Sequence, residues 1–312
     1  MPETFAEKPV APVAPVGPAP RSESPEEPTT SPTTWVLTLA CEDRPGIVHA
    51  VSGAVVAARG NITESQQFAS PDTGRFFMRL QIASDTGRDA LEGALAPVIE
   101  RFDLEASLDV ACRPRRTLIL ASKAAHCVSD LLFHQRSGHL PIEVPLVMAN
   151  HDTLRELVEF HGVPFRSLPV AGPEQKEAFE SAVLEAVDAH DIELVVLARY
   201  MQILSPELCE ALAGRCINIH HSFLPGFKGA NPYRQAHERG VKLIGSTAHF
   251  VTSDLDEGPI IEQNVTRVEH SHSVAQLRQI GQDQECLALR RAVTWFAQSR
   301  VLLDGMRTVI FR

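Results

Sequence analysis

The chain is 312 residues long, with a formal net charge of −10 and a sequence pI of about 5.7. This length indicates two domains rather than one small fold. The acidic balance argues against a surface that binds nucleic acid or an acidic membrane, because clustered Lys and Arg are expected on such surfaces. The six cysteines have no C-x-x-C pair and no regular spacing, which is typical of buried thiols in a reducing compartment rather than of a disulfide scaffold.

The first 33 residues are rich in Pro and Ser and contain almost no large apolar side chains. We expect residues 1–33 to be disordered, because they cannot bury enough surface to offset the entropy of ordering. The start MPETFAEKP has acids and prolines where an export signal needs a basic start and an apolar core. No apolar run approaches the roughly 20 residues that span a bilayer. We therefore expect a cytoplasmic protein that does not enter a membrane.

Residues 34–112 predict a small domain in the order βαββαβ, the ferredoxin-like arrangement. The strands are expected at 35–41, 61–68, 76–82 and from about residue 104. The first helix has apolar residues at 47, 51 and 55 and closes at Gly60, and the second has inward positions at 91, 94, 95, 98 and 102. Asp43 is expected to cap the first helix, and Pro45 suits its first turn.

The loop between the first strand and the first helix carries a recognisable motif. Asp-Arg-Pro-Gly-Ile-Val (residues 43–48), with Gly-Asn-Ile opening the second strand, resembles the ACT domain, a small regulatory module that often binds amino acids at interfaces between copies. The resemblance implies an amino-acid effector held by Asp43, Gly46 and Asn61, and a homo-oligomer, either a dimer or a tetramer. A module that only mediates assembly is the alternative, and the sequence does not separate the two.

After a polar linker at 113–116, residues 117–312 alternate short apolar strands with helical stretches. The strands are expected at 117–121, 143–148, 164–168, 194–197, 216–219 and 243–251, with helices at 152–161 and 175–190 between them. This alternation predicts an α/β fold with a doubly wound, largely parallel sheet and a ligand crevice at the carboxyl ends of the strands. The sequence contains no G-x-G-x-x-G, no G-x-x-x-x-G-K-[ST] and no H-E-x-x-H, so we expect no nucleotide cofactor and no catalytic metal.

The stretch Cys-Ile-Asn-Ile-His, residues 216–220, contains the strongest candidates for chemistry. As a strand it directs Asn218 and His220 to one face and buries Ile217 and Ile219 on the other. An acidic loop that contains Asp256 follows the extended segment 243–251. An amide, an imidazole and a carboxylate can polarise a carbonyl, move a proton and orient the imidazole. Spacing alone does not distinguish this role from that of hydrogen-bonded residues in a core strand.

A longer pattern surrounds these three residues. Asn-Ile-His is followed by Ser-Phe-Leu-Pro-Gly-Phe-Lys-Gly, then by His-Phe-Val and an Asp seven residues after that His. This pattern resembles the signature of formyltetrahydrofolate-dependent formyl-transfer enzymes. The resemblance implies that Asn218, His220 and Asp256 form the catalytic triad. It also implies a folate pocket lined by Met201, Gln202, Ile203 and Leu204 on one side and by Thr252 and Ser253 on the other.

The segment 120–132, after the first strand of the catalytic domain, bears on the acceptor of the formyl group. Glycinamide ribonucleotide formyltransferases have a Gly-rich turn there, whose amides hold the substrate phosphate. This chain has no glycine in the segment, so its backbone is less able to approach a phosphate closely. Ser122, Lys123 and His126 are the substrate-pocket candidates. Ser122 as a helix cap and His126 as a residue of a helix face are the structural alternatives.

The same segment, together with residues 229–236, 240–245 and 300–305, resembles the formyltetrahydrofolate deformylase family from about residue 35 to the carboxyl terminus. The resemblance implies hydrolysis of 10-formyltetrahydrofolate to formate and tetrahydrofolate, in one-carbon metabolism and formate supply for purine synthesis. The folate is then the substrate, and no cofactor is required. Two alternatives stay open: an ACT-regulated formyltransferase that acts on an amine such as glycinamide ribonucleotide, and a folate-sensing regulator that only binds.

Overall fold

The computed structural model describes residues 32–224 and 232–312. The predicted tail therefore lies almost entirely outside the described residues. The turn-forming residues 225, 226 and 229–231 also lie outside them, as does part of the motif that follows Asn-Ile-His.

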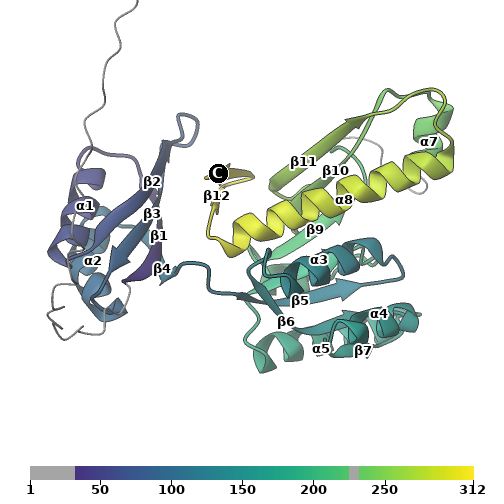
Figure 1. Ribbon diagram of the computed structural model, residues 1–312, viewed down its shortest axis with the longest axis horizontal. Coiled ribbons are helices and arrows are strands. Elements are labelled where there is room, and N and C mark those ends of the chain that lie inside the picture. Colours follow the sequence, from purple (N-terminus) through teal and green to yellow (C-terminus); the bar gives the residue numbers. More distant parts are fainter. Residues whose placement is uncertain (1–31, 225–231) are drawn as a thin grey trace, which may run out of the picture. The chain divides into compact units, whose positions relative to one another are not determined.

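Residues 33–110 have the predicted βαββαβ order, with four antiparallel strands in the spatial order β2-β3-β1-β4. The elements are β1 (Thr33–Glu42), α1 (Ile47–Ala57), β2 (Asn61–Ala69), β3 (Arg75–Ser84), α2 (Arg88–Phe102) and β4 (Glu105–Val110). Both helices cover one face of this sheet (Figure 1). Alternate residues of β1, such as Leu37 and Leu39, pack with Val51 and Val55 of α1 in one buried cluster.

The predicted cap of α1 is wrong. The residue before the helix is Gly46, at φ 98°, and the helix has no side-chain cap. A glycine suits this left-handed backbone because a Cβ would be strained there. The backbone N–H of Asp43 instead donates to the carbonyl of Gly74 at 2.8 Å. Asp43 therefore belongs to the turn that leads from β1 towards the helix.

Residues 115–267 form a seven-stranded sheet in the order β11-β10-β9-β8-β5-β6-β7. Its strands are β5 (Arg115–Ala121), β6 (Ile142–Ala149), β7 (Phe165–Ser167), β8 (Leu194–Ala198), β9 (Cys216–His220), β10 (Leu243–Phe250) and β11 (Ile260–Arg267). Five neighbouring strands are parallel, in the spatial order β7-β6-β5-β8-β9. Strand β10 is antiparallel both to β9 and to β11. The prediction of a largely parallel sheet is confirmed.

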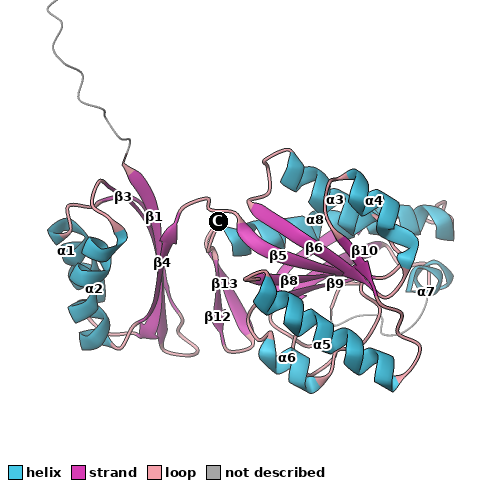
Figure 2. Ribbon diagram, turned by 90° about the horizontal axis from the view of Figure 1, so that it is seen from below, coloured by secondary structure: helices cyan, strands magenta, loops and turns pink. Residues whose placement is uncertain are grey.

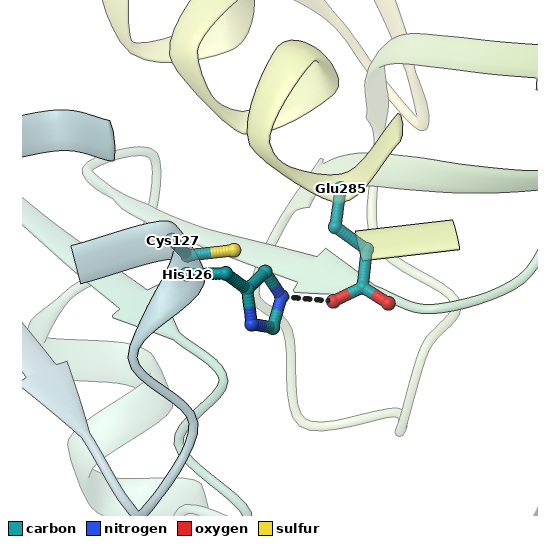
Figure 3. Close-up of side chains that lie close together, drawn as sticks. All are labelled: His126, Cys127 and Glu285. Atoms are coloured by element: carbon teal, nitrogen blue, oxygen red, sulfur yellow. Dashed lines mark hydrogen bonds and ion pairs between the residues drawn. The ribbon is translucent and has the colours of Figure 1, made fainter. Parts of the chain in front are cut away.

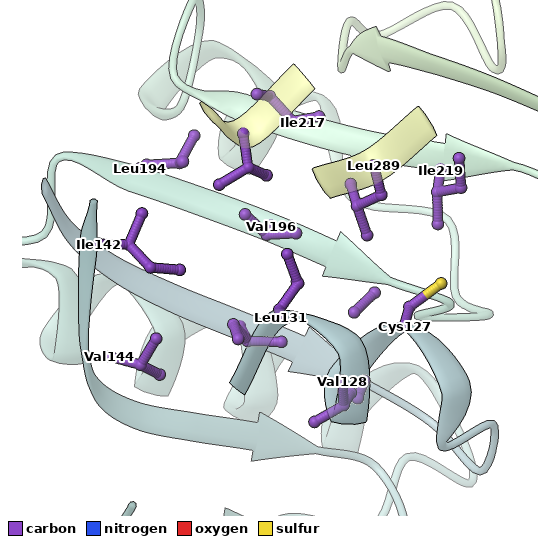
Figure 4. Packing of buried hydrophobic residues seen from close by; sticks show 14 of the residues in the cluster. Cys127, Val128, Leu131, Ile142, Val144, Leu194, Val196, Ile217, Ile219 and Leu289 are labelled. Carbon is purple, nitrogen blue, oxygen red and sulfur yellow. The ribbon is translucent and has the colours of Figure 1, made fainter. Parts of the chain in front are cut away.

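Helices lie on both faces of this sheet, as expected for a doubly wound fold (Figure 2). They are α3 (His126–Arg136), α4 (Arg155–Phe160), preceded by the 3₁₀ turn η1 (Asp152–Leu154), α5 (Pro173–Ala189), α6 (Pro206–Ala211), α7 (Pro232–Glu238) and α8 (Val274–Ala297). Val196 and Ile217 pack with Leu131 of α3 and Leu289 of α8 (Figure 4). Residues next to them in the strands face the other layer and pack with α5 and α6.

The sequence did not predict the end of the chain. The edge strand β11, the 24-residue helix α8 and the hairpin of β12 (Val301–Asp304) and β13 (Arg307–Ile310) were not anticipated. The strand β5 also begins at Arg115, so half of the predicted linker belongs to the sheet. None of the described helices has both the length and the apolar character needed to cross a membrane.

Candidate active site

The carboxyl end of β9 brings Asn218 and His220 to a cavity of about 270 Å³. Ile217 and Ile219 point into the packed core on the other side of the strand, as the alternation predicts. The cavity lies at the end of the parallel strands where α/β sheets bind ligands. Asp256, from the loop after β10, lines the same cavity. The structure therefore brings the three predicted catalytic residues together.

His220 is held from both ring nitrogens. Its Nδ1 lies 3.2 Å from Oδ2 of Asp256, and its Nε2 lies 2.8 Å from the hydroxyl oxygen of Ser222. The hydrogen bond with His220 holds the pKa of Asp256 well below its usual range. A carboxylate that stays ionised keeps the proton of His220 on Nδ1 and leaves Nε2 as the basic nitrogen. Asp256 also has φ 58°, a strained backbone for a residue with a side chain, as is common at functional sites.

His249 is a further site residue, for which the sequence motif that contains it predicts no role. It lies opposite Asn218 in the antiparallel pair of β9 and β10, and its Nε2 is 3.2 Å from Nδ2 of Asn218. Its Nδ1 lies 2.8 Å from the carbonyl of Phe250, which only accepts, so Nδ1 carries the proton. Nε2 then accepts from the Asn218 amide. This contact leaves the second amide hydrogen of Asn218 available for a ligand.

The predicted folate residues all line this cavity. Met201, Gln202, Ile203 and Leu204 come from the segment after β8, and Thr252 and Ser253 come from the loop after β10. Met201 and Ile203 are 60% and 61% exposed. Exposed apolar side chains beside a cavity that ends in polar groups suit a flat ring with polar edges.

The three predicted substrate-pocket residues, Ser122, Lys123 and His126, do not line this cavity. Ser122 is buried, and its hydroxyl accepts a hydrogen bond from the backbone N–H of Met201 at 3.0 Å. It does not cap α3, whose preceding residue is Ala125, so that structural alternative is wrong. Ser122 instead fixes the loop that carries the predicted folate residues 201–204. Lys123 is exposed, and His126 turns towards α8.

His126 belongs to a buried polar network centred on Glu285, which is 1% exposed. Its Nε2 lies 2.8 Å from Oε2 of Glu285 (Figure 3), and the hydroxyl of Tyr233 donates to Oε1 at 2.7 Å. Gly281, one turn before Glu285, makes room for the tyrosine, because a Cβ there would lie 2.1 Å from the Tyr233 hydroxyl. Arg199 completes the network, with its Nε 3.4 Å from Oε2 of Glu285.

Three potential metal ligands meet in this network: His126, Cys127 and Glu285 (Figure 3). Burial opposes ionisation of Glu285, yet the hydrogen bond from His126, the charge of Arg199 and the hydrogen bond from Tyr233 hold its pKa below its usual range. Contact with Cys286 and burial raise the pKa of Cys127, which disfavours the thiolate that binds metals. A carboxylate that already has three partners, one of them an arginine, is unsuited to a cation. We therefore interpret the cluster as an ion-pair network.

The predicted effector residues do not meet within one chain. Asp43 and Gly46 line a surface hollow at the start of α1. Asn61 pairs through Ala83 with Thr34, at the opposite end of the same sheet from Asp43. The separation is about 30 Å, from the rise per residue of a strand. A site that uses all three residues therefore requires two copies of the chain.

Known proteins match both parts of the chain. The formyl transferase family model matches residues 115–293. A formyltetrahydrofolate deformylase of Corynebacterium sp. (strain P-1) is 48% identical over 280 residues, which cover 89% of this chain and 98% of the relative. A second one, from Bacillus subtilis (strain 168), is 44% identical over 88% of this chain and 93% of the relative. The crystal structure of formyltetrahydrofolate deformylase from Burkholderia mallei superposes with a TM-score of 0.87 at 47% identity and covers 90% of this chain and 100% of that one.

The similarity to transferases is more limited. Glycinamide ribonucleotide transformylase 1 from Symbiobacterium toebii has a TM-score of 0.61 at 32% identity. It covers 66% of this chain and 98% of its own. Such a match leaves about a third of this chain unaccounted for, whereas the deformylases extend over nearly all the described residues.

Proposed function

Because the chain belongs to the formyltetrahydrofolate deformylase family, and hydrolyses 10-formyltetrahydrofolate to formate and tetrahydrofolate, we propose that Asn218, His220 and Asp256 catalyse this hydrolysis. The observation that carries the proposal is the meeting of the three side chains at one cavity, with His220 held by Asp256 at 3.2 Å. The proposed step uses only protein side chains and water, without a cofactor or a metal.

In this mechanism the pteridine ring lies between the walls at residues 201–204 and 252–253, with the formyl group towards Asn218. Nε2 of His220 takes a proton from water as the water oxygen attacks the formyl carbon. The amide of Asn218 donates to the developing oxyanion. When the C–N bond breaks, its electron pair stays on the folate nitrogen, which receives the proton from His220. Asp256 stabilises the imidazolium that forms between the two transfers.

The acceptor is tested by counting products. With 10-formyltetrahydrofolate alone, one formate should be released for each folate consumed, and added glycinamide ribonucleotide should change neither the rate nor the ratio. The reason is that the segment 122–126 contains no glycine whose backbone could approach a phosphate. Both products are measured by chromatography after a fixed conversion. Formylated ribonucleotide in place of formate would show that the acceptor is an amine.

We further propose that the βαββαβ part binds an amino-acid effector between paired copies, which makes the protein a dimer or a tetramer. The hollow at Asp43 and Gly46 supports this proposal, because Asn61 can approach it only from a second copy. We also propose that the protein acts in the cytoplasm. All six cysteines are free thiols, which suits a reducing compartment.

Glycine and methionine, both linked to one-carbon supply, are the effectors to try first. Either one should change the hydrolysis rate about fivefold or more in the wild type, the lower range of typical allosteric coupling. Asp43→Ala should abolish that response and leave the basal rate intact. Asp85→Ala, on the same sheet-and-helix unit but outside the hollow, is the matched control. An unchanged rate with both amino acids, together with a monomeric mass by light scattering, would contradict the proposal.

A further inference from the structure

Arg199 occupies an unusual position beside the catalytic cavity. It follows β8 directly, has φ 62°, and precedes the wall formed by residues 201–204. Its side chain lines the same cavity as Asn218, His220 and Asp256, although only 17% of that side chain is exposed. A full positive charge is therefore held largely out of water at the site of reaction.

The guanidinium of Arg199 has almost no partners of its own. Among the described residues its one ion pair is with Glu285, at 3.4 Å from Nε, and that contact lacks hydrogen-bond alignment. Nε is buried without a hydrogen-bond partner. Arginine carries five N–H donors, and buried donors are nearly always satisfied in folded proteins. Arg199 lines the cavity, and its guanidinium makes no hydrogen bond to any described residue. Its planar donor set is therefore suited to a planar anion, above all a carboxylate.

Glu285 explains how this charge is kept in place. The two carboxylate oxygens of Glu285 are already hydrogen-bonded to His126 and Tyr233. Glu285 therefore attracts Arg199 through its charge and leaves the N–H donors of the guanidinium without a hydrogen bond. Figure 3 shows this carboxylate facing His126 from α8. Glu285, which does not itself line the cavity, therefore anchors the arginine. Its role is to position Arg199 rather than to contact the substrate.

The positive charge of Arg199 acts on a histidine that contacts the proposed catalytic residue His220. The ring of His221 stacks on that of His220, with the centroids 4.9 Å apart. Burial, followed by the positive charges of Arg199 and His220, lowers the pKa of His221 to about 4. His221 is thus neutral at physiological pH and lies close to both Arg199 and His220. An anion formed beside His220 would therefore be attracted by the positive charge of Arg199.

We propose that Arg199 binds the formate product, with Glu285 as its positioning residue. This proposal rests on the proposed hydrolysis by Asn218, His220 and Asp256. Water adds its oxygen to the formyl carbon, the C–N bond breaks with its electron pair on nitrogen, and nitrogen takes one proton. The formic acid loses its remaining acidic proton to solvent, and the carboxylate pairs with Arg199. Transfer to an amine would produce a neutral amide, so an arginine here suits hydrolysis in particular.

The test measures inhibition of 10-formyltetrahydrofolate hydrolysis by sodium formate, with sodium chloride added to keep the ionic strength constant. Formate should inhibit the wild type, and Arg199→Gln should raise the formate inhibition constant at least about tenfold, because a charge-assisted bidentate pair is lost. Arg199→Lys, which keeps the charge without the planar fork, should show a smaller rise. Glu285→Gln should also raise the constant, which a purely structural role would not do.

Arg290→Gln is the matched control, because it removes another ion-paired arginine that lies outside the cavity. Its formate constant should equal that of the wild type. An equal formate inhibition constant in the wild type and in Arg199→Gln would overturn the proposal. If Arg199→Gln also had a lower melting temperature, the role of Arg199 would be structural. Loss of tetrahydrofolate binding in Arg199→Gln with formate inhibition intact would assign Arg199 to the carboxylates of the folate instead. Absence of formate release by the wild type would overturn the proposed hydrolysis itself.

Discussion

Asn218→Ala is expected to lower kcat by roughly 10²–10³-fold and to leave KM within a few fold of the wild type, since removal of one oxyanion donor has effects of this size. The Asn218 amide donates one hydrogen to Nε2 of His249, so its other hydrogen is directed by a fixed contact. A donor held in this way acts mainly on the charge that develops in the transition state. Steady-state kinetics with 10-formyltetrahydrofolate would separate kcat from KM.

Two further variants make this result specific. Asn218→Asp keeps the size of the side chain but replaces the donor by an anion, so it should be at least as slow as the alanine variant. Asn264→Ala removes another buried asparagine, on β11 and outside the cavity, and should keep wild-type kcat. A rate for Asn218→Ala above about a tenth of the wild-type rate would exclude the oxyanion role.

Strand β9 could be predicted because two independent signals agree there. Ile217 and Ile219 alternate with Asn218 and His220, which identifies a strand with one apolar and one polar face. The surrounding alternation of strands and helices then places this strand end at the ligand crevice. The folate walls at 201–204 and 252–253 came from the family resemblance and not from periodicity. Their residues line the cavity together.

The far end of the catalytic part could not be predicted from local pattern. The buried face of helix α8 includes small or polar residues such as Gly281, Glu285 and Ala292, which weaken the apolar periodicity that indicates a helix. The strand β11 has buried Glu262 and Asn264, so it does not show a clear alternation of apolar residues. In both elements tertiary packing decides the structure.

Contacts between residues that are distant in the chain could not be predicted from the sequence either. His249 is opposite Asn218 because of the antiparallel register of β10 with β9, which no local motif specifies. Glu285 meets His126 although 159 positions separate them. Ser122 was predicted to lie in the substrate pocket, with helix capping as the alternative, yet its hydroxyl accepts a hydrogen bond from the backbone N–H of Met201, which follows the neighbouring strand β8. Such contacts depend on the topology, so an analysis of local spacing identifies the residue types but not their partners.

His220→Ala is expected to lower kcat by roughly 10²–10⁴-fold, the range for loss of a general acid–base group. Both proposed proton transfers pass through Nε2 of His220, whereas Asn218 and Asp256 act only on charge and orientation. Added imidazole should restore part of the rate, because alanine leaves room for a free ring beside Asp256. The restored rate should rise with imidazole concentration in a stopped assay of formate release.

His134→Ala provides a control of the same chemical type, since His134 also lies near a carboxylate, Asp130, at 3.6 Å, but outside the cavity. It should keep wild-type kcat and should not respond to imidazole.

The pKa of Asp256 is held well below its usual range, so its carboxylate stays ionised across neutral pH in the wild type and continues to orient an added imidazole. Asp256→Asn combined with His220→Ala should therefore lose the rescue. Rescue of equal size in the double variant would mean that Asp256 does not orient the ring. A His220→Ala variant that retains more than about a tenth of the wild-type rate would show that the proton transfers do not pass through His220.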